Sequence, residues 1–92
     1  MKQIFYFTAE WCGPCRSLGP VMEKASETIL NENRGNWASI PIEKINIDYE
    51  TDRTKAANVM SVPTVVLAEN GQEVRRFVGA KSYQEVMQFI NG

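Results

Sequence analysis

The 92-residue chain has no histidine and only two cysteines, Cys12 and Cys15. A thiol that acts as a nucleophile in this chain must therefore be activated without an imidazole base. Two sulfurs are also too few to hold a structural zinc ion, which takes four nitrogen or sulfur ligands. A zinc ion shared between two chains remains an alternative, but we expect neither a metal nor a bound cofactor.

Long apolar runs and a strong charge of one sign are also missing. No stretch approaches the ~20 apolar residues that cross a bilayer, and the N-terminal MKQIFYF is too short for the apolar core of a signal peptide. The net charge of −1 gives no basic surface for nucleic acid or an anionic membrane. We therefore expect one monomeric, cytoplasmic domain over residues 1–92, with no nucleic-acid or membrane partner.

The apolar pattern in the first half of the chain predicts a strand, a long helix and a second strand. Residues 4–7 (IFYF) form a continuous apolar run, which indicates a central strand buried on both faces. Apolar residues then recur at helical spacing, with Pro20 inside the pattern, where it predicts a kink. The segment 33–36 (NRGN) ends this helix, and residues 42–47 form the next strand.

The second half of the chain predicts a short helix followed by a β-hairpin. Residues 51–59 (TDRTKAANV) fit the helix, and Thr51 is the candidate for its N-cap. PTVVLA (63–68) then forms an apolar strand. Asn70-Gly71 joins it to QEVRRFV (72–78), and an Asn-Gly pair between two such runs is typical of a tight antiparallel hairpin.

A third helix closes the chain. Ser82 and Glu85 have the spacing of a capping box at its start, and one face carries the apolar residues Tyr83, Val86, Met87 and Ile90. The resulting element order is β-α-β-α-β-β-α. Strands that are separated by helices pair in parallel, whereas a hairpin is antiparallel. We therefore predict an α/β fold with a four-stranded mixed sheet and helices on both faces.

The two cysteines lie in the segment AEWCGPC (9–15), where the first strand gives way to the long helix. Pro14 suits an early helical position, which places Cys12 near the N-cap. Backbone N–H groups and the positive end of the helix dipole then favour the thiolate form of Cys12. Cys15 lies one turn later and can attack a mixed disulfide on Cys12, so an exposed attacking thiol is paired with a resolving thiol.

Two other interpretations of the pair compete with this one. A purely structural disulfide across so short a loop would remove little entropy from the unfolded chain. Two inert buried thiols would leave Trp11, Gly13 and Pro14 unexplained. Dithiol–disulfide exchange is therefore the leading hypothesis.

The motif WCGPC resembles the active site of thioredoxins, and the resemblance extends along most of the chain. KINID (44–48) resembles the central-strand motif of that family, VMSVPT (59–64) its cis-proline loop, and ENG (69–71) and VGA (78–80) two further motifs. The resemblance implies a thioredoxin-like fold with a cis Val62-Pro63 bond. It also implies a protein-disulfide reductase, an electron donor to target enzymes that needs no bound cofactor.

The resemblance further implies roles for the matching residues. Cys12 would be the attacking nucleophile and Cys15 the buried resolving cysteine, while Gly13 and Pro14 would tune the redox potential. An apolar patch would dock substrate proteins through Trp11, Val62, Pro63, Gly79 and Ala80. The implied partners are an electron donor of the thioredoxin-reductase type and disulfide-containing substrate proteins, with ribonucleotide reductase as one candidate.

The chain departs from the family pattern in two places. The strand and helix that usually precede the first strand are absent, so we expect a compact form, similar in architecture to glutaredoxins. Tyr6 also stands where the family has a buried aspartate that accepts the proton of the resolving cysteine. A phenol is a poor base at neutral pH, so we predict that water or Lys44 deprotonates Cys15. Lys44 matches a buried lysine of the family; the alternative is a side chain that extends into solvent.

Other functions remain open from the sequence. The same pair would serve a disulfide oxidase or isomerase, or a glutaredoxin-like enzyme, because the direction of exchange depends on the redox potential. Gly-Pro between the cysteines resembles the reducing members of the family. A non-catalytic thioredoxin-like binding module is the alternative from another class, and it would use the apolar surface that includes Met60. We expect Glu10 and Asp48 to face solvent.

Overall fold

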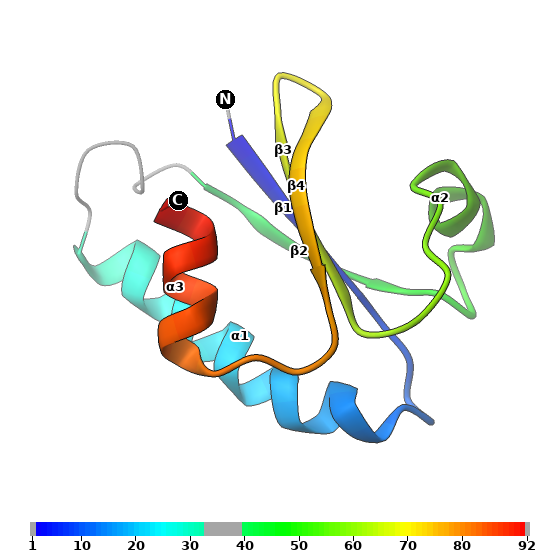
Figure 1. Cartoon of the computed structure of the whole chain (residues 1–92), viewed down its shortest axis with the longest axis horizontal. Helices are drawn as coiled ribbons and strands as arrows, with labels where there is room; N and C mark the ends of the chain where they lie inside the picture. Colours follow the sequence, from blue (N-terminus) through cyan, green and yellow to red (C-terminus); the bar gives the residue numbers. More distant parts are fainter. Residues whose placement is uncertain (1, 33–39, 92) are drawn as a thin grey trace.

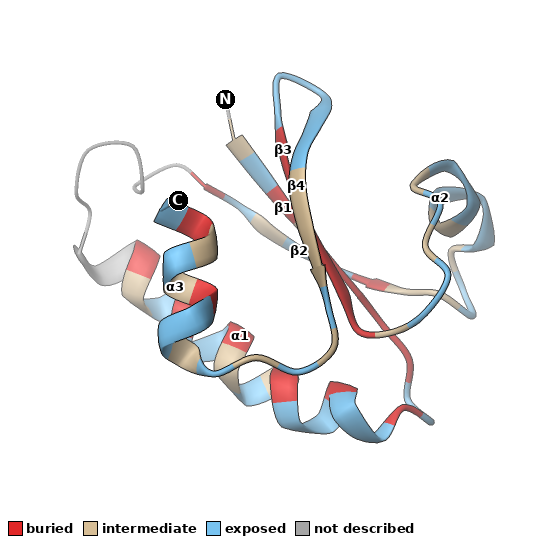
Figure 2. Cartoon of the chain, viewed as in Figure 1, coloured by how far each residue is buried: buried red, intermediate tan, exposed pale blue. Residues whose placement is uncertain are grey.

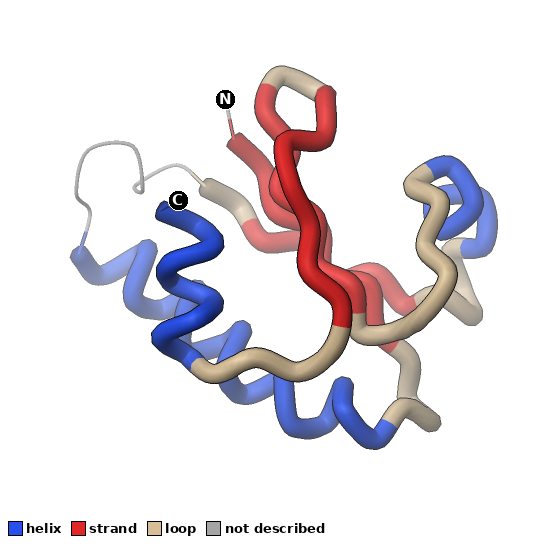
Figure 3. Tube along the Cα trace, viewed as in Figure 1, coloured by secondary structure: helices blue, strands red, loops and turns tan. Residues whose placement is uncertain are grey.

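The elements follow the predicted order. The computed structural model describes residues 2–32 and 40–91, and the predicted helix end at 33–36 lies outside them. Figures 1 and 3 show the path of the chain through three helices and four strands. Their bounds are β1 (Lys2–Thr8), α1 (Gly13–Glu32), β2 (Ile42–Asn46), α2 (Thr51–Ala56), β3 (Thr64–Glu69), β4 (Gln72–Val78) and α3 (Tyr83–Asn91).

The four strands form one mixed sheet in the order β2-β1-β3-β4. β1 pairs in parallel with β2, whereas the β1–β3 and β3–β4 pairs are antiparallel. The fold class and the mixed pairing are therefore confirmed. The register brings Thr8 beside Asn46, Phe7 beside Thr64, and Thr64 beside Val78. The loops that follow β1, β2 and β4 and the loop that precedes β3 consequently meet at one edge of the sheet.

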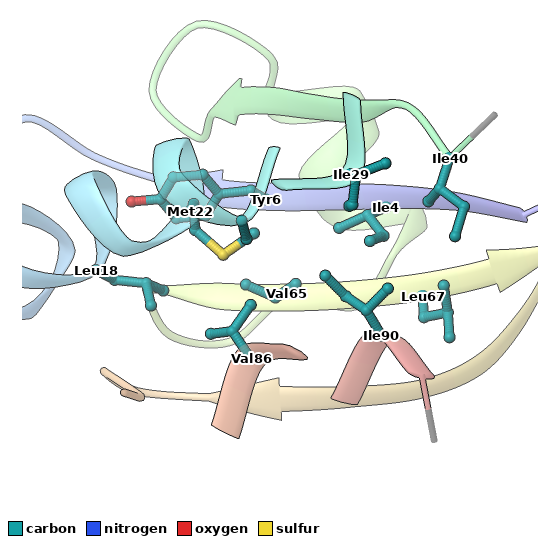
Figure 4. Close-up of a cluster of buried hydrophobic side chains, with 11 residues drawn as sticks. Ile4, Tyr6, Leu18, Met22, Ile29, Ile40, Val65, Leu67, Val86 and Ile90 are labelled. Carbon is teal, nitrogen blue, oxygen red and sulfur yellow. The ribbon is translucent and has the colours of Figure 1, made fainter. Parts of the chain in front are cut away.

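The larger hydrophobic core lies between the sheet and the pair α1 and α3. Figure 1 shows these two helices together on one side of the sheet and α2 on the other. Side chains from β1, β3 and both helices interdigitate there (Figure 4), and each large buried one contributes about 2 kcal/mol of burial free energy. The core consists of Ile4, Tyr6, Leu18, Met22, Ala25, Ile29, Ile40, Val65, Leu67, Val86 and Ile90.

A smaller core lies on the opposite face of the sheet. Phe7, Ile45 and Val66 form it, so β1 is buried on both faces, as its continuous apolar run predicts. Helix α2 contributes no buried residue to it, and Figure 2 shows that helix without a buried position. The hydrophobic core on the α1 and α3 side of the sheet is therefore much larger than the core on the α2 side.

Of the two sequence signals for element ends, the Asn-Gly turn is confirmed and the N-cap at Thr51 is not. Asn70 and Gly71 have φ angles of 55° and 84°, the left-handed pair of a tight hairpin turn, so the hairpin is confirmed. The assignment of Thr51 as an N-cap is wrong: Thr51 is the first helical residue and Glu50 the N-cap, with no side-chain capping bond. The turn after β2 determines where α2 begins, because the Asn46 carbonyl accepts the N–H of Glu50 at 3.0 Å.

The helices also bear on membrane insertion. None of those in the described residues 2–32 and 40–91 combines the length and the apolar composition that a bilayer crossing requires.

Candidate active site

The cysteine pair sits at the edge of the sheet where the four loops meet. Cys12 directly precedes α1 and Cys15 lies in its first turn. Their Sγ atoms are joined in a disulfide, with the Cα atoms 5.3 Å apart, a normal span for this bond. Together with Ala9 they form a small buried cluster against Ile47 and Val62.

Cys12 occupies the N-cap of α1, as the position of Pro14 predicts. The backbone N–H of Cys15 donates to Cys12 Sγ at 3.2 Å, so the sulfur takes the place of the capping oxygen found at other helices. Such a donor and the positive end of the helix dipole both stabilise negative charge on the sulfur. Both effects favour a thiolate at this position and need no histidine.

The expectation that Cys12 is exposed is wrong for this disulfide form. Both cysteines are only 4% exposed. Cys12 Sγ is turned inward by its bond to Cys15 and lies 3.5 Å from the carbonyl oxygen of Val62. In the reduced form a Cys12 thiol can donate to that oxygen, whereas a disulfide sulfur carries no proton. The loop before β3 therefore covers the Cys12 sulfur.

The loop before β3 contains the cis proline. The Val62-Pro63 peptide bond is cis, which confirms the expectation from the resemblance. Pro63 itself is fully buried, and its carbonyl oxygen accepts the N–H of Gly79 at 2.9 Å. Gly79 has a φ of +93°, a conformation that favours glycine. This bond holds the loop after β4 against the cis-proline loop.

Four of the five predicted docking residues reach the surface. Trp11 is 65% exposed and Ala80 is exposed, while Val62 and Gly79 are half-buried. Pro63 lies beneath them. Met60, at 88% exposed, adds a large apolar side chain that precedes Val62 by two residues. The sequence therefore located an exposed apolar surface at the cysteines.

Asp48 is a site residue whose role the sequence analysis missed. Its carboxylate accepts the indole N–H of Trp11 at 2.9 Å, and Tyr49 Oη donates to Glu10 Oε1 at 3.5 Å. Both bonds join the loop after β2 to the loop after β1. The available signal was the parallel β1–β2 pairing, because it brings the segments after both strands to the same edge.

The surroundings of Cys15 differ from the family pattern. Tyr6 is 4% exposed, and its hydroxyl donates to the carbonyl oxygen of Cys15 at 3.2 Å. Lys44 is exposed, so the expectation of a buried lysine is wrong and the solvent-facing alternative holds. Over residues 2–29 and 40–91, the only buried polar or charged residues other than Tyr6 and the cysteines are Thr8 and Thr64. No described carboxylate is therefore buried beside Cys15.

The described part of the chain also bears on the zinc alternative. No group of three or more potential metal-ligating side chains comes together within it. The two sulfurs are bonded to each other in this form and so have no thiolate to offer a metal. A cysteine at a helix N-cap, bonded to a second cysteine one turn later, instead defines a site for dithiol–disulfide exchange.

Comparisons with known proteins agree with this class of site. The family model described as Thioredoxin matches residues 2–92. The thioredoxin of Mycoplasma pneumoniae is 36% identical over 90 residues, which are 98% of this chain and 80% of that protein. A bifunctional thioredoxin reductase/thioredoxin of Mycobacterium leprae is 37% identical over 75 residues, 82% of this chain and 15% of its own length.

A solved structure agrees as well. The crystal structure of a Malassezia sympodialis thioredoxin superposes with a TM-score of 0.83 at 29% identity, and the match covers 98% of this chain and 72% of that one. The chain belongs to the thioredoxin family. It is a protein thiol-disulfide oxidoreductase, and Cys12 and Cys15 are its redox-active pair.

Proposed function

We propose that the protein reduces disulfides in other proteins, with Cys12 as the attacking nucleophile and Cys15 as the resolving cysteine. The hydrogen bond from the Cys15 N–H to Cys12 Sγ carries this assignment. It stabilises the thiolate of the first cysteine at the helix N-terminus, where an attacking sulfur needs to be ionised.

The reaction transfers two electrons in two exchanges. The Cys12 thiolate attacks one sulfur of the target disulfide, and the other target sulfur leaves as a thiolate that takes a proton from solvent. Cys15 then loses its proton and attacks Cys12 Sγ. The mixed disulfide breaks, the second target thiolate leaves, and the Cys12–Cys15 disulfide forms. The pair is oxidised and the target is reduced.

Substrate proteins dock, in this proposal, on the apolar surface formed by Trp11, Val62, Gly79 and Ala80, with Pro63 supporting it from beneath. A large exposed aromatic beside a reactive sulfur is the kind of group that anchors protein interfaces. Gly13 and Pro14, both exposed between the cysteines, are proposed to set the redox potential of the pair.

The proposed electron donor is of the thioredoxin-reductase type and reduces the Cys12–Cys15 disulfide after each turnover. The Mycobacterium leprae relative supports this, since its name joins a thioredoxin reductase and a thioredoxin in one protein. Ribonucleotide reductase is retained as one candidate among the substrate proteins. We place the protein, as a monomer, in the cytoplasm, because a reducing compartment keeps such a pair in its active dithiol form.

Trapping of the mixed disulfide tests the assignment of the two cysteines. Reduced Cys15→Ser should accumulate a covalent adduct with a disulfide protein such as insulin, because the first exchange proceeds and the second cannot. Cys12→Ser is the matched control and should trap little. An adduct of equal yield on Cys12→Ser, or none on Cys15→Ser, would show that the roles are wrong.

A further inference from the structure

Tyr6 is a buried titratable residue for which the exchange reaction as described has no use. Its ring belongs to the larger core, and Figure 4 shows its hydroxyl at the end of that core where Leu18 and Met22 lie. The hydroxyl donates to the main-chain carbonyl of Cys15 at 3.2 Å. A phenol from β1 therefore holds the backbone of the resolving cysteine on α1.

A polar recess lies directly beside this contact. It has a volume of about 210 Å³ and is lined by Tyr6, Thr8, Glu10, Cys15, Arg16 and Lys44, together with Ala9 and Gly19. A water molecule takes about 30 Å³, so the recess has room for several. Its three charged residues, Glu10, Arg16 and Lys44, are all exposed, so the recess borders solvent. Water can thus reach the resolving cysteine.

The charges around Cys15 come from three segments. Arg16 projects from α1, Lys44 from β2, and Glu10 from the loop after β1. A second recess of about 170 Å³ shares Tyr6, Gly19 and Lys44 and adds Glu23 from α1. The recess at Cys15 itself therefore has two cations and one carboxylate, and an excess of positive charge favours a thiolate.

We propose that the Cys15 proton leaves to water in this recess, and that Tyr6 is the positioning residue that holds Cys15 against it. The proton passes from the Cys15 thiol to a recess water and on to solvent. The resulting thiolate attacks Cys12 Sγ, and the bond from Cys12 to the target sulfur breaks. This route replaces a buried carboxylate with solvent and surface cations. It rests on the proposed roles of Cys12 and Cys15.

Gly19 makes the route testable without disturbing the core. A Cβ built on Gly19 would lie 4.0 Å from Tyr6 Oη, which is an ordinary contact. Gly19→Ala should therefore fold, since alanine also has a higher helix propensity than glycine. Its methyl group narrows the recess beside the hydroxyl. Tyr6→Phe removes the hydroxyl and keeps the ring.

The experiment follows the reaction of the reduced protein with 5,5′-dithiobis(2-nitrobenzoate) by stopped flow. The first release of thionitrobenzoate reports attack by Cys12, and the second reports attack by Cys15 on the mixed disulfide. A missing first phase would overturn the proposed roles of the cysteines, whereas this inference depends on the second phase alone. The two failures are therefore distinguishable.

We expect Tyr6→Phe to slow the second phase about fivefold, the effect of losing one ordinary hydrogen bond, and to leave the first phase unchanged. Tyr83→Phe is the matched control, because it removes a half-buried phenol that packs against the same core and pairs with Thr28 Oγ1 at 2.7 Å. Gly19→Ala should also slow the second phase. An unchanged second phase in Tyr6→Phe would overturn the positioning role, and an unchanged second phase in Gly19→Ala would overturn the role of the recess.

The pH profile of the second phase tests the proton route. Lys44→Met should shift its rise to higher pH, because one cation near the forming thiolate is lost. Lys44→Arg should restore the profile, and Lys55→Met, a lysine on exposed α2, should leave it unchanged. If Glu10→Gln instead abolishes the second phase at neutral pH, that carboxylate accepts the proton and the water route is wrong.

Discussion

Single residues decide the chemistry of this site, and Cys12 is the clearest case. Its sulfur replaces the capping oxygen of α1 and receives the N–H of Cys15 at 3.2 Å. The same position turns the sulfur inward, so that it is covered in the disulfide form. The start of the helix therefore favours a thiolate at Cys12 and also buries the Cys12 sulfur in the disulfide form.

Asp48 fixes the exposed indole of Trp11, and its loss should affect substrate docking more than the exchange itself. Asp48→Ala removes the acceptor of the Trp11 N–H. We expect the KM for insulin to rise about threefold to fivefold with kcat nearly unchanged, since one surface hydrogen bond is lost.

Asp48→Asn retains a side-chain oxygen and is the conservative control, which should stay within twofold of the parent protein. A KM for Asp48→Ala equal to that of the parent would show that the orientation of Trp11 does not contribute to docking.

The residues that sequence could identify are those whose role is set locally. Pro14 fixes the start of α1 and with it the capping position of Cys12. Asp48 is exposed, as the sequence predicts, but its hydrogen bond to Trp11 was missed. For Lys44 the sequence left a buried and a solvent-facing position open. Both outcomes depend on contacts with segments distant in the sequence. The hydrogen-bond partner of Tyr6 could not be predicted either, because no local sequence pattern indicates that a phenol on β1 reaches the carbonyl of Cys15.

Among the elements, α3 has a reciprocal pair of capping hydrogen bonds at its N-terminus. Ser82 Oγ accepts the N–H of Glu85 at 3.2 Å, and Glu85 Oε1 accepts the N–H of Ser82 at 3.0 Å. This reciprocal capping box confirms the expectation from the sequence. The backbone bond from Ser82, and after it the side-chain bond, lower the pKa of Glu85 below its usual value of 4.5.

Ser82→Ala should lower the free energy of unfolding by about 1 kcal/mol at neutral pH, because one N-terminal N–H of α3 loses its acceptor. A lowered pKa in the folded state means that ionised Glu85 stabilises the fold above pH 4.5. That contribution disappears as the pH falls through the lowered value.

Urea titrations at several pH values measure this effect, with Ser17→Ala as the control, since Ser17 is an exposed serine inside α1. Equal losses of stability for the two variants would contradict the capping role of Ser82.

The contrast between α3 and α2 shows where sequence patterns succeed for an element. The capping box and the Asn-Gly turn each specify a backbone geometry within four residues. The N-cap of α2 was misplaced by one position, because the turn from Asn46 decides where that helix begins. The α2 helix also lacks a buried face, so no apolar periodicity was available to correct the placement.

Over the whole molecule, stability is divided unevenly between the two faces of the sheet. The α1 and α3 side holds the larger core, whereas α2 has no buried residue and is joined to β2 by an exposed ion pair. Arg53 pairs with Glu43 and Glu50, and Arg76 Nη2 donates to the Ala57 carbonyl at 2.8 Å. Such exposed contacts contribute little stability.

The rates of amide hydrogen exchange should therefore differ between the elements. We expect the amides of β1 and β3 to exchange only on global unfolding, and those of α2 (Thr51–Ala56) to exchange through local opening many times faster. Mass spectrometry of the exchanged peptides measures both. Protection of α2 equal to that of β1 would show that the α2 side of the sheet is as stable as the side covered by α1 and α3.

The central claim is that Cys12 and Cys15 form a reducing pair that acts on other proteins. The most direct test equilibrates the protein with dithiothreitol or glutathione buffers of defined potential and determines the fraction of dithiol by thiol alkylation. We predict a midpoint close to the value of about −270 mV known for thioredoxin. A midpoint near about −120 mV, the range of a disulfide oxidase, would contradict a reductase.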